Sequence, residues 1–302
     1  MKRILVVYNP RSSRFHDVKK EVLDCLPKLR GYIIGKYEVE PTDVDKNASK
    51  FAKLLKDGDL VISAGGDATG VISANAILNS GKDVTLAVLP YGNFNDLSRT
   101  LGTKNLDEIL SNQNQSGCLY PLEIIIDGKP FRFATCYVTI GMMAEAVKLY
   151  DTPKLRRKLK TKFGRKVSSY TQLAGWYFKN RHKKVFLPDF KLNGKLQPKK
   201  TSDYAAVNGR FMARVMKGGE DYKSPTAFRS ETDRLTNFWR LSKLMSKSIL
   251  RRVPGATTKG DILEFTEPAT VELQAEGEYR VFENIKTIEV RKSKKCLKVI
   301  TN

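Results

Sequence analysis

Short apolar runs alternate with helical patterns along the first 117 residues. The runs Ile4–Tyr8, Leu60–Ser63 and Thr85–Leu89 are mostly apolar, which predicts buried strands. Between them, apolar residues recur every three or four positions in 17–29 and 46–55, which predicts helices. Strands that alternate with helices in this way predict a parallel sheet covered by helices.

After about residue 118 the pattern changes to short strands separated by turns. Asp127-Gly128 and Asn193-Gly194 are typical hairpin turns. The expected strands are Leu122–Ile126, Phe131–Val138, Lys184–Phe190, Ala205–Val207, Ile262–Phe265, Val271–Gln274, Ile285–Val290 and Leu297–Ile300. This half therefore predicts an antiparallel β-sandwich. We expect two domains, an α/β domain over 1–117 and a β-sandwich domain over 118–302.

Positive charge is concentrated in one segment. The chain carries a net charge of +22, and residues 151–200 hold 16 lysines and arginines against only Asp151 and Asp189. Apolar residues recur at helical spacing from Leu155 to Tyr177, so a basic amphipathic helical insertion is expected near 153–181. Such a helix suits an anionic membrane surface, and we expect residues 154–184 to contact one. An ordinary helix that packs its apolar face on the sandwich is the alternative.

The remaining composition favours a cytoplasmic protein with peripheral membrane association. No run approaches the roughly 18 apolar residues of a membrane span, and the apolar run after Lys2-Arg3 is too short for a signal peptide. The cysteines are Cys25, Cys118, Cys136 and Cys296, with no CxxC pair and only two histidines in the chain. A zinc site is therefore not expected, and the four cysteines are expected to be reduced.

The most specific motif is Gly65-Gly66-Asp67-Ala68-Thr69, which follows a predicted strand and precedes a predicted helix. Glycines allow a ligand to approach the backbone closely, and a helix N-terminus presents N–H groups to anions. Asp67 suits magnesium, a bound water or a nucleotide contact. Taken alone, the element could equally be an ordinary tight turn.

Two further polar segments follow neighbouring strands. One extends from Leu89 to Arg99 and contains Gly92, Asn93, Asn95 and Asp96, and the other is Asn9-Pro10-Arg11-Ser12-Ser13. Ligands of open α/β sheets bind at the carboxyl ends of the strands, where all three segments are expected to lie. The three loops together predict a nucleotide-binding crevice.

In order and spacing, these motifs resemble the diacylglycerol kinase catalytic-domain superfamily. The family patterns NPxSG, GGDGT and LPxGTxNDFAR match 9–13, 65–69 and 89–99. Later matches are Thr139–Gly141, Asn208-Gly209 and the turn Glu276-Gly277-Glu278, which corresponds to a DGE motif. The matched positions extend over almost the whole chain.

The resemblance implies a lipid kinase that transfers the γ-phosphate of ATP to a lipid hydroxyl, with diacylglycerol as the first candidate acceptor. It implies ATP and Mg²⁺ as cofactors, with Asp67 and Asp96 at the metal and Glu276, or secondarily Glu278, as the base. The nucleotide residues that it implies are Asn9, Arg11, Ser12, Gly65, Gly66, Thr69, Gly92, Asn93 and Asn95.

Several positions depart from the family pattern. They are Ala68, Val71-Ile72, Asn93, Glu123 and Glu276, where the family has Gly, Asn-Glu, Thr, Asp and Asp. A degenerate member that binds nucleotide or lipid without catalysis is therefore the alternative. A nucleic-acid-binding protein is disfavoured because no zinc, RRM or KH signature is present. An NAD kinase fits less well, since that family lacks the LPxGTxND and DGE combination, and a homodimer is left open.

Overall fold

The computed structural model describes residues 2–12, 14–40, 43–113, 115–145, 175, 186–212, 216–234 and 255–301. It contains two compact units. Unit 1 consists of Met1–Pro121 and Ser293–Asn302, and unit 2 consists of Leu122–Lys292. The expected basic helix near 153–181, and with it the expected membrane contact, lies outside the described residues apart from Gly175.

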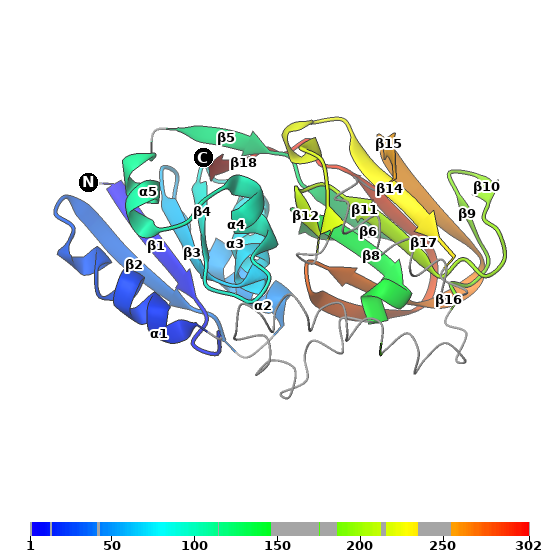
Figure 1. The fold of residues 1–302 in the computed structure, drawn as a ribbon, viewed down its shortest axis with the longest axis horizontal. Coiled ribbons are helices and arrows are strands. Elements are labelled where there is room, and N and C mark those ends of the chain that lie inside the picture. The colour runs from blue at the N-terminus through cyan, green and yellow to red at the C-terminus, as the bar shows by residue number, and fades with distance from the viewer. Residues whose placement is uncertain are drawn as a thin grey trace. The chain divides into compact units, whose positions relative to one another are not determined.

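A six-stranded sheet forms the centre of unit 1, in the order β2-β1-β3-β4-β18-β5 (Figure 1). All neighbours pair in parallel except β18 and β5, which are antiparallel. The strands are β1 (Lys2–Tyr8), β2 (Tyr32–Glu38), β3 (Leu60–Gly65), β4 (Thr85–Pro90), β5 (Ser116–Leu119) and β18 (Leu297–Ile300). The predicted α/β fold of the N-terminal part is confirmed.

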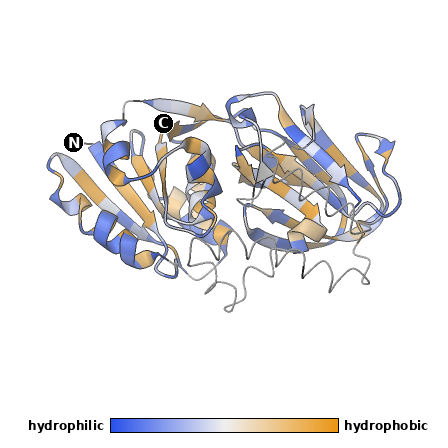
Figure 2. Ribbon diagram, viewed as in Figure 1, coloured by the Kyte–Doolittle hydropathy of each residue, from blue (hydrophilic) through white to orange (hydrophobic). Residues whose placement is uncertain are grey.

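Helical segments cover both faces of this sheet. One face packs against α1 (Phe15–Val18), the π turn Lys19–Leu23, the 3-10 turn Leu26–Lys28 and α5 (Leu106–Ser111). Helix α3 (Asp67–Ser80) contacts β1, β3, β4 and β18 and packs against α2 (Val44–Ala52), and α4 (Asp96–Leu101) follows β4. The strands of this sheet are largely hydrophobic, as expected for a doubly covered sheet (Figure 2). The single helix expected over 17–29 is instead three short turns, with Pro27 inside the last.

The end of the chain returns to unit 1. Strand β18 lies between β4 and β5, Lys298 forms a 2.6 Å ion pair with Asp83, and Lys295 Nζ donates to the Leu78 carbonyl at 3.0 Å. The predicted strand at Leu297–Ile300 therefore exists but belongs to the other sheet. The chain passes from unit 1 to unit 2 between Pro121 and Leu122 and returns to unit 1 between Lys292 and Ser293. The sequence predicted a single domain boundary, at residue 117.

Two cysteines join the last two strands of this sheet. Cys118 on β5 and Cys296, directly before β18, form a disulfide whose Cα atoms are 5.5 Å apart, while Cys25 and Cys136 are free thiols. The expectation of four reduced cysteines was wrong for this pair. The two residues are 178 positions apart, and only the pairing of β5 with β18 brings them together.

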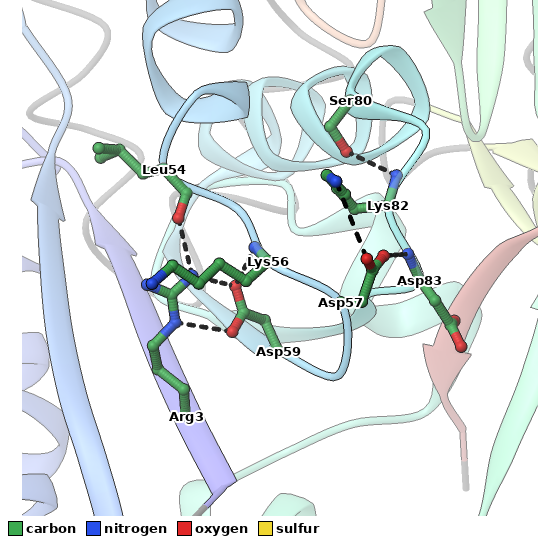
Figure 3. A network of polar contacts seen from close by, with 8 residues as sticks. All are labelled: Arg3, Leu54, Lys56, Asp57, Asp59, Ser80, Lys82 and Asp83. Atoms are coloured by element: carbon green, nitrogen blue, oxygen red, sulfur yellow. Dashed lines mark hydrogen bonds and ion pairs between the residues drawn. The ribbon is translucent and has the colours of Figure 1, made fainter.

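Charged side chains close the edge of the sheet at which β1, β3 and β4 begin (Figure 3). Arg3 donates to both carboxylate oxygens of Asp59, at 2.7 and 2.5 Å, and to the Leu54 carbonyl. Asp57 accepts from the Asp83 N–H at 2.7 Å and lies 3.8 Å from Lys82 Nζ. Ion pairs hold this edge of the sheet. The loops with the ligand-binding motifs follow the ends of the same strands and therefore lie at the opposite edge.

Unit 2 is built on an antiparallel sheet in the order β15-β14-β11-β8-β16-β17-β6-β7, with the β9–β10 hairpin paired to β16. The strands are β6 (Leu122–Ile126), β7 (Lys129–Ala134), β8 (Tyr137–Gly141), β9 (Phe190–Leu192), β10 (Lys195–Leu196), β11 (Asp203–Val207), β14 (Phe228–Asp233), β15 (Ala256–Thr258), β16 (Gly260–Ala275) and β17 (Glu278–Lys292). A separate hairpin of β12 (Phe211–Met212) and β13 (Met216–Lys217) precedes the 3-10 turn Asp221–Lys223. The predicted antiparallel C-terminal fold is confirmed.

Three strand predictions in unit 2 change. Of the strand expected at Lys184–Phe190, residues 186–189 are not in a strand, and only Phe190 belongs to one, β9. The two strands expected at Ile262–Phe265 and Val271–Gln274 are one strand, β16, whose register shifts between Glu264 and Val271. Pro268 lies in the shifted part, where its missing N–H favours a bulge. The single strand expected at Phe131–Val138 is instead two strands, β7 and β8. They are separated by Thr135 and Cys136, whose polar groups form hydrogen bonds with residues outside these two strands.

Candidate functional site

The glycine loop of unit 1 connects β3 to α3, as the sequence predicted. Gly66 is the N-cap residue of the 14-residue helix, and no side chain in the described part of the chain caps it. A Cβ atom on Gly65 would lie 2.3 Å from Thr69 Oγ1, so glycine is required where Thr69 folds back over the loop. Thr69 is 1% exposed, and its side chain therefore packs inside the loop.

The segment after β4 lies directly against this glycine loop. A Cβ atom on Gly92 would be 2.3 Å from the Gly66 Cα atom, so the two backbones meet without side chains between them. Asn95 has a φ of 57° and closes its own loop, with Oδ1 accepting from the Gly92 N–H at 2.7 Å. Its Nδ2 donates to the Gly92 carbonyl at 2.9 Å. The Asn95 side chain therefore shapes the loop.

Asp67 ties the two loops together. Its carboxylate accepts from the Asn95 N–H at 2.9 Å and the Asp96 N–H at 2.6 Å, which are the first N–H groups of α4. Desolvation among the loops raises the pKa of Asp67, although these N–H groups act in the opposite direction. A carboxylate at a helix N-terminus stabilises the helix dipole, so Asp67 fixes the start of α4.

The third loop, after β1, joins the same cluster. Ser12 Oγ donates to the Tyr91 carbonyl at 2.8 Å, and Asn9 Oδ1 accepts from the Arg11 N–H at 2.9 Å. The Arg11 residue is exposed. Arg14 donates to the Pro90 carbonyl at 3.1 Å and lies over the Tyr91 ring, 5.2 Å from its centroid. The three loops predicted to share one edge of the sheet do lie together.

Asp96 and Asp67 are candidates for a metal site. Asp96 is 2% exposed, and the Arg99 guanidinium lies 3.8 Å from its Oδ1 atom. Burial lowers the pKa of Arg99, while the charges of Asp96 and Asp67 oppose that change. Within the described ranges no cluster of three or more His, Cys, Asp or Glu is found. Two carboxylates fit Mg²⁺, which uses one or two protein carboxylates and completes its shell with phosphate and water oxygens.

Glu276 lies in unit 2, in the two-residue turn between β16 and β17. It has a φ of 52°, its partner Gly277 has a φ of 91°, and Glu276 is only 3% exposed. Its Oε1 atom accepts from the Thr135 hydroxyl at 2.7 Å and from the Cys136 N–H. The first residue of this turn is therefore buried, and Glu278 beside it is half-buried.

Asn208 approaches the same point from another strand. It is fully buried, its Nδ2 donates to the Thr135 carbonyl at 2.7 Å, and the N–H groups of Asn208 and Gly209 donate to the Cys136 carbonyl. Two motifs far apart in sequence, Asn208-Gly209 and Glu276-Gly277-Glu278, therefore meet at Thr135 and Cys136. These contacts explain why β7 and β8 are separate strands.

Glu123, a departure from the family pattern, has a different environment. Its Oε2 atom lies 3.0 Å from the Arg291 guanidinium, which also pairs with Glu289 at 3.3 Å. Glu123 raises the pKa of Arg291 through this hydrogen bond. In the structure its carboxylate thus serves as one half of an ion pair between β6 and β17.

Residues 3–125 match the model of the diacylglycerol kinase catalytic domain. These residues include all three loops of the cluster in unit 1. The match covers less than half of the chain, so it shows that this part is similar to the diacylglycerol kinase catalytic domain. The diacylglycerol kinase of Bacillus subtilis (strain 168) is 31% identical over 169 residues, which cover 54% of this chain and 52% of that protein. The Staphylococcus epidermidis (strain ATCC 12228) diacylglycerol kinase is 32% identical over 145 residues, or 47% of this chain and 40% of that protein.

The chain thus matches about half the length of the diacylglycerol kinases to which it is similar. A solved structure of a diacylglycerol kinase from Bacillus anthracis str. Sterne has the same fold, with a TM-score of 0.63 at 16% identity. That match covers 100% of this chain and 97% of the other. In the part of the chain that the structure describes, no helix is both long and apolar enough to cross a membrane.

Three residues that contact the candidate site residues, one in unit 1 and two in unit 2, were not predicted from the sequence. Arg14, Thr135 and Cys136 contact the predicted residues but belong to none of the motifs. Arg14 follows the first motif directly, so its position was the one available signal. Thr135 and Cys136 lie within what reads as a continuous strand, and no local pattern marks them.

Proposed function

We propose that this protein is a lipid kinase that transfers the γ-phosphate of ATP to a lipid hydroxyl, with diacylglycerol as the first candidate acceptor. The observation that carries the proposal is the contact of Gly66 with Gly92 inside a diacylglycerol kinase catalytic domain. Two backbones that meet without side chains allow a phosphate group to approach them closely, beside the N-terminus of α3.

The proposed nucleotide site divides its work between backbone and side chains. Backbone groups of Gly65 and Gly66 bind the phosphates of ATP, helped by the side chains of Asn93 and Arg11. Gly92, whose N–H donates to Asn95, gives the phosphates room to approach. Asn9, Ser12, Thr69 and Asn95 hold the loops in shape, as their hydrogen bonds and packing indicate. Phosphoryl transfer depends mainly on such positioning and on charge neutralisation.

Asp67 and Asp96 are the residues that would hold Mg²⁺. When bound, the ion neutralises charge on the phosphates. The Asp67 carboxylate also accepts the N–H groups of Asn95 and Asp96, so the same carboxylate would fix the start of α4 and contact the ion.

Glu276 is the proposed general base, with Glu278 as the secondary candidate. The lipid oxygen forms a bond to the γ-phosphorus, the bond to ADP breaks, and the hydroxyl proton passes to the Glu276 carboxylate. Hydrogen bonds from Thr135 and Cys136 stabilise the ionised form that a base requires.

The test is transfer of labelled γ-phosphate from ATP to a panel of lipids in mixed micelles with Mg²⁺. We expect transfer to diacylglycerol and a loss of about 100-fold or more in Asp67→Asn. Asp57→Asn is the matched control, because Asp57 lies at the opposite edge of the same sheet and should retain activity (Figure 3). ATP binding without transfer to any lipid would instead identify a non-catalytic nucleotide-binding protein.

We also propose that the protein acts at the surface of anionic membranes. The net charge of +22, with 16 basic residues in 151–200, supports electrostatic attraction to such a surface. Binding to vesicles that contain phosphatidylserine should weaken as salt increases. Equal binding to neutral vesicles at all salt concentrations would contradict the proposal.

A further inference from the structure

A buried lysine lies at the last position of β17. Lys292 is 7% exposed, and its Nζ atom donates to Asn208 Oδ1 and to the Asp221 carbonyl, the latter at 2.7 Å. Burial lowers the pKa of Lys292 to about 7, although the charge of Asp221 opposes the change. Lysines are rarely buried to this extent, and those that are buried are held by polar partners, as Lys292 is.

The strand pattern alone would place an apolar residue here. Ile288 and Val290 precede Lys292 on the same face of β17, and both are fully buried. Lys292 stands opposite Leu122, another fully buried residue. An apolar side chain at 292 would continue this face, so packing does not account for the ammonium group.

The contacts of Lys292 lead to Glu276 through two side chains. Asn208 accepts from Lys292 through Oδ1, and this leaves its Nδ2 group to donate to the Thr135 carbonyl. Thr135 in turn donates its hydroxyl to Glu276. Each amide has one accepting and one donating end, so the lysine fixes which end of Asn208 faces Thr135.

We infer that Lys292 is a positioning residue for Glu276: through Asn208 it holds Thr135 and Cys136 in the place where they donate to the Glu276 carboxylate. The inference rests on the proposed function insofar as Glu276 is the base. Without Lys292, the buried Oδ1 of Asn208 loses its donor, and the amide can turn and withdraw its bond from Thr135. The Glu276 carboxylate then loses part of the hydrogen bonding that favours its ionised form.

The experiment compares Lys292→Met with Lys286→Met, an exposed lysine on the same strand, in the full-length protein. The Glu276 carboxyl signal is followed by NMR in protein with ¹³C-labelled glutamate and assigned by its absence in Glu276→Gln. In Lys292→Met we expect the Glu276 pKa to rise by about 0.5 to 1 unit and kcat to fall about 10-fold, with KM for ATP within about twofold. Lys286→Met should leave all three unchanged.

An unchanged Glu276 titration in folded Lys292→Met would overturn the inference. If Lys292→Met does not fold, Asn208→Ala is the second variant, because it removes the side chain between Lys292 and Thr135. The Glu276 pKa must then rise by the same amount in Asn208→Ala. An unchanged Glu276 pKa in that variant would also overturn the inference. The titration needs no enzymatic activity. If wild-type protein phosphorylates no lipid but the titration still shifts, the kinase proposal fails while the positioning role stands.

Discussion

Two hairpin turns of unit 2 have the same backbone and different first residues. Asp127-Gly128 connects β6 and β7 with φ of 45° and 75°, and Glu276-Gly277 connects β16 and β17 with φ of 52° and 91°. Aspartate and asparagine are preferred at the first position of such turns because their short polar side chains tolerate positive φ. Glutamate gains no such advantage.

The side chains of the two turns also differ in what they contact. Asp127 is exposed, and its Oδ1 atom accepts from the N–H groups of Lys286 and Thr287 on β17. Glu276 is buried and accepts from Thr135 and Cys136, between two strands. The comparison indicates that Asp127 is selected for the turn, whereas Glu276 is retained there for its carboxylate.

The largest expected effect concerns catalysis. Glu276→Gln keeps an accepting oxygen but removes the base, so kcat for lipid phosphorylation should fall by roughly 10² to 10⁴. Asp127→Asn, the same change in the other turn, should leave kcat within about twofold. Initial rates with saturating ATP and lipid measure both variants. Comparable losses in the two variants would remove the distinction between the turns.

The hydroxyl groups that serve the two carboxylates offer a second contrast. Thr135→Val removes a buried 2.7 Å bond to Glu276 and should lower the free energy of unfolding by about 1.5 to 3 kcal/mol. Thr287→Val removes a 3.3 Å contact to the exposed Asp127 and should cost less than about 0.5 kcal/mol. Urea denaturation measures the free energy of unfolding of both variants. Equal losses of stability would show that the burial of Glu276 does not make its hydrogen bond more important than that of Asp127.

The glycines of the two turns should behave alike. Gly277→Ala and Gly128→Ala each place a Cβ atom on a residue with positive φ, and no heavy atom of the described residues lies within 4 Å of the point that either Cβ would occupy. Only backbone strain is introduced, so each change should cost about 1 to 2 kcal/mol. If their unfolding free energies differed by much more than about 0.5 kcal/mol, the backbones of the two turns would not be equivalent.

The smallest effect is the pH dependence of Asp127. Partial desolvation opposes the change, but the N–H groups of Thr287 and Lys286 lower the pKa of Asp127 overall. Because the pKa is lower in the folded protein, Asp127 stabilises it at neutral pH and loses this effect as pH falls through that pKa. Asp127→Asn should therefore lower the unfolding midpoint slightly at pH 7 and by less near pH 2. If the difference in unfolding midpoint between the wild type and Asp127→Asn grew as the pH fell, the pKa of Asp127 would not be lowered in the folded protein.

Much of unit 1 could be predicted because its strands are local apolar runs. β1, β3 and β4 were found within a few residues, and the motifs at their ends located the three loops. The assignment of β18 to the C-terminal domain and the prediction of reduced cysteines failed for one reason. The sequence of Leu297–Ile300 predicts a strand but does not indicate which strands it pairs with. These partners, like the pairing of Cys118 with Cys296, depend on residues far away in the sequence.

For the candidate site, the sequence suggested residues but could not predict their contacts. Asp67 was expected at a metal or nucleotide, but its hydrogen bonds to the start of α4 depend on tertiary structure. The break at Thr135 could not be anticipated because its causes, Asn208 and Glu276, lie 73 and 141 residues away. Lys292 was missed because one lysine at the end of a strand looks like the start of a solvated loop.

The points at which the chain leaves and re-enters unit 1 are adjacent in space. The Ser293 N–H donates to the Pro121 carbonyl at 2.9 Å, next to strands already joined by Cys118 and Cys296. Unit 2 is thus an insertion whose two ends could be bridged by a turn of a few residues. A shortened gene that joins Pro121 to Ser293 through such a turn would preserve every strand of the six-stranded sheet, which makes unit 1 a candidate for separate expression.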